Sequence, residues 1–142
     1  MKMGKVIVQV KLTNHTDLVL KEINARKKSP RSMIADLLVD TGAMRLYLKS
    51  SVIRQLGLKP SGKVLSRTTN GARERKVYHP VRLEVQGRDG AFEVVEVDDD
   101  VPNLLGQIPL EHLDFVVDSK NRKLIPNPEH GDRQMSEEYQ AL

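Results

Sequence analysis

An aspartate stands at the end of an apolar stretch of the chain. Residues 33–39 become uniformly apolar just before Asp40, which is followed by Thr41, Gly42 and Ala43. Uniformly apolar runs are typical of strands that are buried on both faces. A carboxylate placed there can act as a general base or a general acid, and two adjacent carboxylates that share one proton can do both. Asp40 is therefore the first candidate for chemistry.

The same tripeptide also occurs in solvated turns, because Asp, Thr and Gly all favour turns. Two features favour a functional site at Asp40 over such a turn. The first is the apolar strand that leads to it and would bury the loop. The second is a later apolar-apolar-Gly sequence, Leu104-Leu105-Gly106.

Short strands and turns are expected on both sides of the aspartate. The β-branched residues 4–12 and the apolar run from Leu18 flank the turn residues 14–17, which predicts a β-hairpin. A short helix is expected through residues 52–56, ended by the glycine that follows it. The Asn-Gly pair within Thr69-Asn70-Gly71-Ala72 predicts an exposed hairpin tip.

The second half of the chain predicts two more hairpins and another short helix. Residues 78–85 and 91–97 partly alternate between apolar and polar side chains around the turn sequence at 87–90. Proline at the start of residues 109–113 suits the first turn of a helix. Two apolar triplets within residues 115–125 flank a polar turn and predict the last hairpin.

The length of 142 residues suits one compact domain. We expect that domain to cover residues 1–127. Residues 128–142 are polar and lack periodicity, which predicts a flexible C-terminal tail.

The sequence around the aspartate resembles a known family. Residues 37–43, Leu-Leu-Val-Asp-Thr-Gly-Ala, resemble the active-site loop of the retropepsin-like aspartic proteases, which include retroviral proteases and small bacterial relatives. Later landmarks follow in the family's order: Leu56-Gly57-Leu58, Thr69-Asn70-Gly71 and Leu104-Leu105-Gly106-Gln107. The resemblance implies that the last of these is a strand that braces the active-site loop. The resemblance covers residues 5–127. It implies a mainly β fold, a closed barrel-like structure with one or two short helices, assembled as a homodimer.

The resemblance also implies an activity and roles for single residues. It implies an aspartic endopeptidase in which the Asp40 carboxylates of two subunits share a water. The chain contains one Asp-Thr-Gly, and a twofold-symmetric dimer supplies the second carboxylate because residues on the axis meet their own copies. In the family, the residue matching Thr41 hydrogen-bonds across the dimer, and the glycine matching Gly42 permits tight backbone packing. The hairpin tip would be a flap that closes over an extended peptide. The substrate-binding residues implied in this way are Ala43, Thr69, Asn70, Gly71, Leu105 and Gly106.

Departures from the family's pattern bear on substrate preference and on the dimer. Gln107 stands where retroviral proteases carry an arginine, and Met44 and Arg45 follow Ala43 where many relatives carry Ser or Thr. A second function also stays open, since a fold does not fix an activity. The chain would then be a dimeric peptide-binding or adaptor module with little or no turnover.

Composition and charge limit the other classes. The chain has no cysteine, which excludes disulfides, thiolate nucleophiles and Cys-ligated metals. The histidines lack metal-binding spacing, so no metal or cofactor is expected. The formal charge is +4, but basic residues are dispersed apart from residues 26–31 and no aromatics interleave with that cluster, so a nucleic-acid partner is not expected. No signal peptide or membrane span is recognised, which predicts a cytoplasmic protein whose partners are its own copy and a peptide or protein substrate.

Three other motifs are better explained as loops or turns. Residues 57–63 have phosphate-loop spacing, but Val64 replaces the magnesium-binding Ser or Thr, and the segment follows a helix where that motif follows a strand. Asp118-Ser119 looks like a second active-site loop, yet Lys120 replaces the glycine. The consecutive carboxylates at 98–100 lack the spaced ligands of a calcium site.

Overall fold

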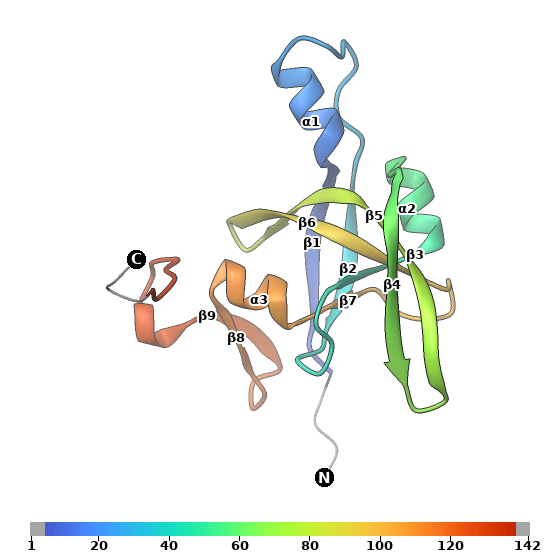
Figure 1. The fold of residues 1–142 in the computed structure, drawn as a ribbon. Coiled ribbons are helices and arrows are strands. Elements are labelled where there is room, and N and C mark those ends of the chain that lie inside the picture. The colour runs from blue at the N-terminus through green and yellow to red at the C-terminus, as the bar shows by residue number, and fades with distance from the viewer. Residues whose placement is uncertain (1–4, 139–142) are drawn as a thin grey trace.

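The computed structural model describes residues 5–138 and shows a mainly β protein (Figure 1), which confirms that part of the predicted fold class. The strands are β1 (Ile7–Asn14), β2 (Ser32–Val39), β3 (Leu46–Lys49), β4 (Pro60–Thr68), β5 (Gly71–Val85), β6 (Arg88–Val97), β7 (Leu104–Leu105), β8 (Phe115–Asp118) and β9 (Lys123–Pro126). The helices are α1 (His15–Glu22), α2 (Ser50–Leu56), α3 (Gln107–Leu113) and the short 3-10 helix η1 (Pro128–His130).

Seven of these strands form one sheet in the order β1-β2-β7-β3-β6-β5-β4. Strand β1 also pairs antiparallel with β5, Lys11–Asn14 lying against Val81–Glu84, so the first strand of the order meets the sixth. Strands β8 and β9 form a separate hairpin. In Figure 1, α1 lies at one end of the molecule, while the β8–β9 hairpin and the β4–β5 hairpin lie on opposite sides.

The core of the described residues is a cluster of mostly aliphatic side chains from the sheet, the helices and the β8–β9 hairpin. Burial alternates along β1, so that Val8, Val10 and Leu12 point inward and pack in the same cluster as Leu37 and Leu83. Each fully buried aliphatic side chain stabilises the fold by roughly 1.5–3 kcal/mol. Leu37 is fully buried and anchors β2, the strand before Asp40, in the core. The expectation that this strand is buried on both faces is wrong, because burial alternates along it and Ile34 is 57% exposed.

The structure differs from the sequence-based prediction after β1. Helix α1 replaces the second strand of the expected first hairpin. The side-chain Oδ1 of Asn14 accepts a hydrogen bond from the backbone N–H of Asp17 at 3.0 Å and caps the helix. The Nδ2 of Asn14 donates to the carbonyl of Leu56 at 2.9 Å, which ties this helix start to the end of α2. The segment predicted as a turn is therefore a helix N-terminus.

The other predicted hairpins and helices are present, although α2 and α3 begin two residues before the predicted starts at 52 and 109 and one turn is shifted. Together with α1, the described residues contain three α-helices where the resemblance implied one or two short ones. The turn between β5 and β6 consists of Gln86 and Gly87, whose φ angles are 47° and 82°. Residues 88–90, predicted as part of that turn, belong to β6. Helix α2 ends at Gly57, with φ 64°, as the sequence predicts.

The polar segment after residue 127 makes specific contacts that its composition does not predict. Asp114 is buried and accepts hydrogen bonds from the ring of His130 at 2.6 Å and from the backbone N–H of Met135 at 2.9 Å. Asn127 also donates to this carboxylate, at 3.1 Å. The segment therefore lies against the end of α3. The parts of the domain and tail predictions that concern residues 1–4 and 139–142 lie outside the described residues.

Candidate active site

Asp40 follows β2 at the point where that strand pairs with its neighbours. Leu38 and Val39 pair in parallel with the two residues of β7, and the backbone N–H of Val39 donates to the carbonyl of Val6 at 2.8 Å. The N–H of Asp40 itself donates to the carbonyl of Leu105 at 3.0 Å. The approach to the carboxylate is thus held on both sides by backbone hydrogen bonds.

The residues after Asp40 turn the chain back on itself. The backbone N–H of Ala43 donates to the carbonyl of Asp40 at 3.1 Å. The N–H of Gly42 donates to the side-chain Oδ1 of Asp40 at 2.9 Å. The loop therefore orients its own carboxylate, in the way that Asx-type turns do. The second carboxylate oxygen has no hydrogen-bond partner within residues 5–138 and is free to meet a water or another group.

Gly106 lies where the β2–β3 loop crosses the start of α3. Its N–H donates to the carbonyl of Arg45 at 2.9 Å, and the N–H groups of Gln107 and Ile108 donate to the carbonyls of Ala43 and Met44 at 2.8 and 2.9 Å. A Cβ atom on Gly106 would lie 2.4 Å from the carbonyl oxygen of Arg45 and 2.7 Å from that of Ala43. Only glycine allows this approach.

A buried asparagine is a supporting residue that the sequence did not reveal. The carbonyl of Asn103 accepts from the N–H of Leu38 at 2.8 Å, and its side-chain Oδ1 accepts from the N–H of Lys49 at 2.8 Å. Asn103 thereby joins the strand before Asp40 to the start of α2. A polar residue directly before the apolar pair of β7 was the available signal, but loops contain many such residues.

The loop around the candidate carboxylate is open to solvent. Asp40 and Ala43 are half-buried, and Thr41 and Gly42 are exposed. A cavity of about 250 Å³ lies beside the loop, between the chain entering β1 and the β8–β9 hairpin. Its lining residues are Lys5, Val6, Leu38, Val39, Asp40, Thr41, Val117 and Ser119. Thr41 and Gly42 are therefore positioned where a second molecule can reach them.

The predicted flap residues lie at the tip of the β4–β5 hairpin. Thr68 pairs with Gly71 across the turn formed by Thr69 and Asn70, and all four residues are exposed. In the part of the chain that the structure describes, no hydrogen bond or ion pair joins this tip to the Asp40 loop. The structure thus confirms the exposed hairpin tip and does not bring it into contact with Asp40.

Leu105 and Gly106 lie behind the Asp40 loop, whereas the resemblance implies that they contact a substrate. Leu105 is fully buried, pairing with Leu46 of β3 as well as with Val39 of β2. Gly106 is also buried and faces the backbone of the loop. Within the described chain these two residues support the Asp40 loop, and their contact with a substrate stays a prediction.

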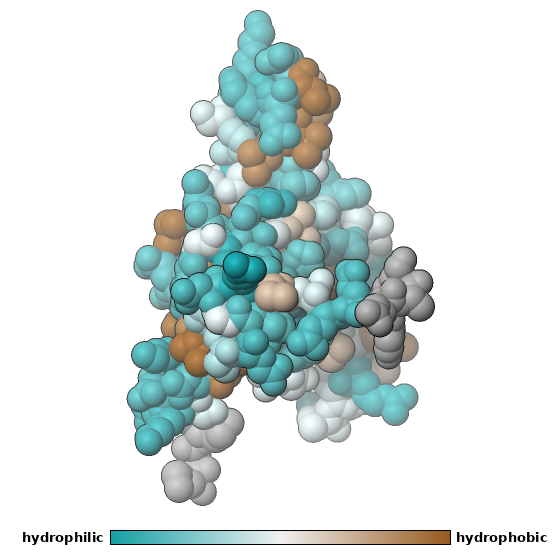
Figure 2. Space-filling view, turned by 90° about the vertical axis from the view of Figure 1, so that its left-hand side faces the viewer, coloured by the Kyte–Doolittle hydropathy of each residue, from teal (hydrophilic) through white to brown (hydrophobic). Residues whose placement is uncertain are grey.

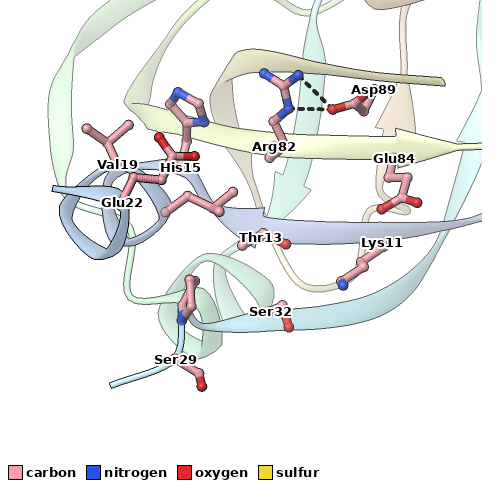
Figure 3. Close-up of a pocket in the computed structure, with 12 residues that line it drawn as sticks. Lys11, Thr13, His15, Val19, Glu22, Ser29, Ser32, Arg82, Glu84 and Asp89 are labelled. Atoms are coloured by element: carbon pink, nitrogen blue, oxygen red, sulfur yellow. Dashed lines mark hydrogen bonds and ion pairs between the residues drawn. The ribbon is translucent and has the colours of Figure 1, made fainter. Parts of the chain in front are cut away.

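A larger cavity than the one beside the loop is lined by other residues. It has a volume of about 870 Å³ and lies between α1 and the outer face of strands β1 and β5 (Figure 3). Polar side chains dominate it, including the ion pair of Arg82 with Asp89 at 2.6 Å. Apolar surface gathers at the α1 end of the molecule (Figure 2), where Val19 and Ile23 are exposed. Asp40 does not line this cavity.

One group of side chains in the described residues is close enough to share an ion. Ligand atoms of Glu129, His130 and Glu137 all lie within 4.8 Å of one another. Both ring nitrogens of His130 already face carboxylates, Asp114 at 2.6 Å and Glu137 at 2.9 Å. We therefore interpret the group as an ion-pair cluster that fastens the C-terminal segment.

Comparison with known proteins agrees with the geometry of the loop. A strand-borne Asp-Thr-Gly loop, braced by an apolar-apolar-Gly strand, is the arrangement of an aspartic protease. A family model described as an aspartyl protease matches residues 33–108, just over half of the chain. The protein belongs to this aspartyl protease family, which is part of the retropepsin-like clan. No curated protein matches the chain.

None of the helices within residues 5–138 combines the length and the apolar character needed to cross a lipid bilayer.

Proposed function

We propose that the protein is an aspartic endopeptidase that acts as a homodimer, with one water held between the Asp40 carboxylates of its two subunits. The observation that carries the proposal is the braced, solvent-open loop that presents a single Asp40 from the end of β2, a strand whose Leu37 is buried in the core. Membership of the aspartyl protease family supports the same reaction.

The chemistry requires two carboxylates in different protonation states. Peptide hydrolysis without a metal needs a base that activates water and an acid that protonates the leaving amide. Two carboxylates a few ångströms apart cannot both ionise, so they share one proton and divide these roles. The apparent pKa values then belong to the pair. Each chain supplies one Asp-Thr-Gly, and a twofold axis through the loop supplies the other.

The rest of the assembly follows the same symmetry. Thr41 and Gly42 are exposed beside Asp40, so they are available to hydrogen-bond and pack against their own copies. The ring of strand pairings that includes β1 and β5 would serve as a closed barrel that keeps each loop rigid. The β4–β5 hairpin would close over a bound, extended peptide and exclude water from it.

Replacement of Asp40 tests the proposal. Asp40→Asn should lower the rate of cleavage of a mixed peptide library by at least about 1,000-fold, because it removes the base and the acid together. The mass in solution should stay at twice the 16.0 kDa of the chain. Asp36→Asn is the matched control, since Asp36 is exposed and lies on the same strand. An Asp40→Asn protein with full activity would remove the proposal.

A mixed dimer tests whether the site is shared. Dimers that contain one wild-type subunit and one Asp40→Asn subunit should be as inactive as the double variant. Half of the wild-type activity would instead mean that each subunit carries its own site. Wild-type protein that binds peptides and never cleaves them would favour the adaptor function.

A further inference from the structure

The β4–β5 hairpin carries the charge imbalance of the whole chain. The segment from residue 60 to residue 76 has one acidic side chain, Glu74, and five basic ones. The basic side chains are Lys63, Arg67, Arg73, Arg75 and Lys76. Their formal charge of +4 equals that of the entire protein, so the rest of the chain carries equal numbers of basic and acidic side chains.

Little of this charge is neutralised by the protein itself. Lys63 pairs with Glu74 at 3.2 Å, and Arg73 pairs with Asp98 at 3.1 Å. All four of these side chains are more than half exposed. The other three basic side chains have no acidic partner within 4.0 Å in the described part of the chain. Exposed pairs of this kind contribute little to stability, so the fold gives no reason for the charge.

The pairing of the strands places like charges opposite each other. Lys63 lies directly across from Lys76, and such like-charged cross-strand pairs are unfavourable. Leu65, on the same face, is 70% exposed, and Arg67 follows it two residues later on that face. Along β4 this face therefore alternates basic and apolar groups, while along β5 it carries Lys76, Glu74 opposite Leu65, and Ala72 opposite Arg67. Three basic side chains and one acidic side chain thus share the face. An extended segment that alternates acidic and apolar side chains would complement it.

The hairpin also offers a free edge to such a segment. Strand β4 is the last in the order of the sheet, and among residues 5–138 it pairs with β5 alone. The backbone N–H and C=O groups on its outer side can hydrogen-bond an added strand. We propose that the β4–β5 hairpin recognises acidic polypeptide segments, which are the substrates of the endopeptidase if the proposed function holds.

A nucleic acid is the other polymer with dense negative charge, and the hairpin suits it less well. Residues 60–76 contain no Phe, Tyr or Trp, so the hairpin has no platform on which bases stack. The exposed Leu65 and the free strand edge are features that a polypeptide uses and a phosphate backbone does not.

Binding to a defined pair of peptides tests the proposal without any need for turnover. The probes are a fluorescein-labelled decapeptide of alternating Glu and Leu and the same peptide with Gln in place of Glu, measured by anisotropy with the Asp40→Asn protein. The Glu peptide should bind at least about tenfold more tightly at low ionic strength, and the difference should shrink in high salt. Equal affinity for the two peptides overturns the proposal.

A charge-neutral variant locates the binding surface. Arg67→Gln with Lys76→Gln removes two exposed, unpaired charges and should weaken binding of the Glu peptide about fivefold. Lys27→Gln with Lys28→Gln removes the same charge from exposed positions outside the hairpin and should leave binding unchanged. A Glu preference that survives in the hairpin variant overturns the proposal.

A ten-nucleotide single strand is the third probe. Tighter binding of that strand than of the Glu peptide, lost in the hairpin variant, would assign the surface to nucleic acid and overturn the proposal. Selective binding of the Glu peptide by a protein whose wild type cleaves nothing would support the acidic-polypeptide surface and remove the proposed endopeptidase. The two hypotheses therefore fail in different measurements.

Discussion

The backbone N–H of Asp40 donates to the carbonyl of Leu105 at 3.0 Å, although these residues lie far apart in the sequence. Strand β7 is only two residues long, yet it pairs with β2 on one side and with β3 on the other. The position of the candidate carboxylate therefore depends on a short segment that lies between two strands. Gly106 follows β7, and its lack of a side chain allows the loop between β2 and β3 to pack against it.

Gly106→Ala should destabilise the fold and abolish cleavage. The added Cβ would lie 2.4 Å from the carbonyl oxygen of Arg45, which is backbone and cannot move aside without shifting the loop. Overpacking of this kind costs roughly 1–3 kcal/mol, so we expect a loss of about 2 kcal/mol in the free energy of unfolding. Urea unfolding gives the stability, and the peptide-library assay gives the rate.

Gly62→Ala is the control for this substitution. Gly62 lies in β4, and nothing lies within 4 Å of the Cβ that alanine would add. Its free energy of unfolding should stay within about 0.5 kcal/mol of the wild type, so it serves as the control for the stability measurement. If Gly106→Ala changed the free energy of unfolding as little as Gly62→Ala does, Gly106 would not be needed for the packing of the Asp40 loop.

The role of Leu105 shows what the sequence could and could not give. The apolar-apolar-Gly pattern predicted a strand that braces the Asp40 loop, and that prediction is confirmed. The contact of Leu105 with a substrate stays a prediction, and the structure shows only that its side chain is fully buried in the single chain. An apolar residue beside an active-site loop can face either the core or the ligand, and its direction depends on strand pairings that are distant in sequence.

Asn14 and the β4–β5 hairpin show two other limits. Asparagine is common in turns and at helix N-caps, so the same residue was consistent with a hairpin turn and with the start of α1. In the hairpin, Lys63 and Lys76 are distant in sequence and meet only through the register of the two strands. Charge that is dispersed along a sequence can therefore gather on one surface, and the sequence alone does not reveal it.

Asp17 is expected to hold α1 in place through a carboxylate that stays ionised. It is 2% exposed and accepts hydrogen bonds from the Nε of Arg31 at 2.8 Å and from the backbone N–H of Arg31 at 3.0 Å. The side-chain hydrogen bond from Arg31 is the main cause that lowers the pKa of Asp17. Asp17→Asn should lower the free energy of unfolding by about 2 kcal/mol, less than a fully buried pair would lose, because Arg31 is partly exposed.

The same pair predicts the direction of a pH effect. A carboxylate whose pKa is lowered on folding contributes stability above its unfolded pKa, and this contribution is lost as the pH falls through the lower, folded value. The stability difference between wild type and Asp17→Asn should thus be constant above pH 3.8 and shrink below it. Asp89→Asn, which breaks an exposed ion pair with Arg82, is the control and should change stability by less than about 0.5 kcal/mol. If Asp17→Asn and Asp89→Asn lowered the free energy of unfolding equally, Asp17 would not hold α1 in place as expected.

His130 should give the C-terminal segment a pH dependence of the opposite sign. Hydrogen bonds to Glu137 and then to Asp114 raise the pKa of His130 above 6.5. A histidine whose pKa is raised on folding contributes its full stabilisation below pH 6.5, and this is lost as the pH rises through the folded value. The ring should therefore hold the segment against α3 in mildly acidic solution and release it in alkaline solution.

The backbone N–H of Met135 reports on that release, because it donates to the same Asp114 carboxylate at 2.9 Å. Its hydrogen exchange, corrected for the intrinsic effect of pH, should show protection at pH 6 that weakens by pH 9, and the ring signal of His130 should titrate with a midpoint above 6.5. His130→Gln should remove the pH dependence, whereas His79→Gln, at an exposed position on β5, should keep it. Since the protonated ring is satisfied by carboxylates on both nitrogens, a midpoint below 6.5 would mean that these contacts do not form in solution.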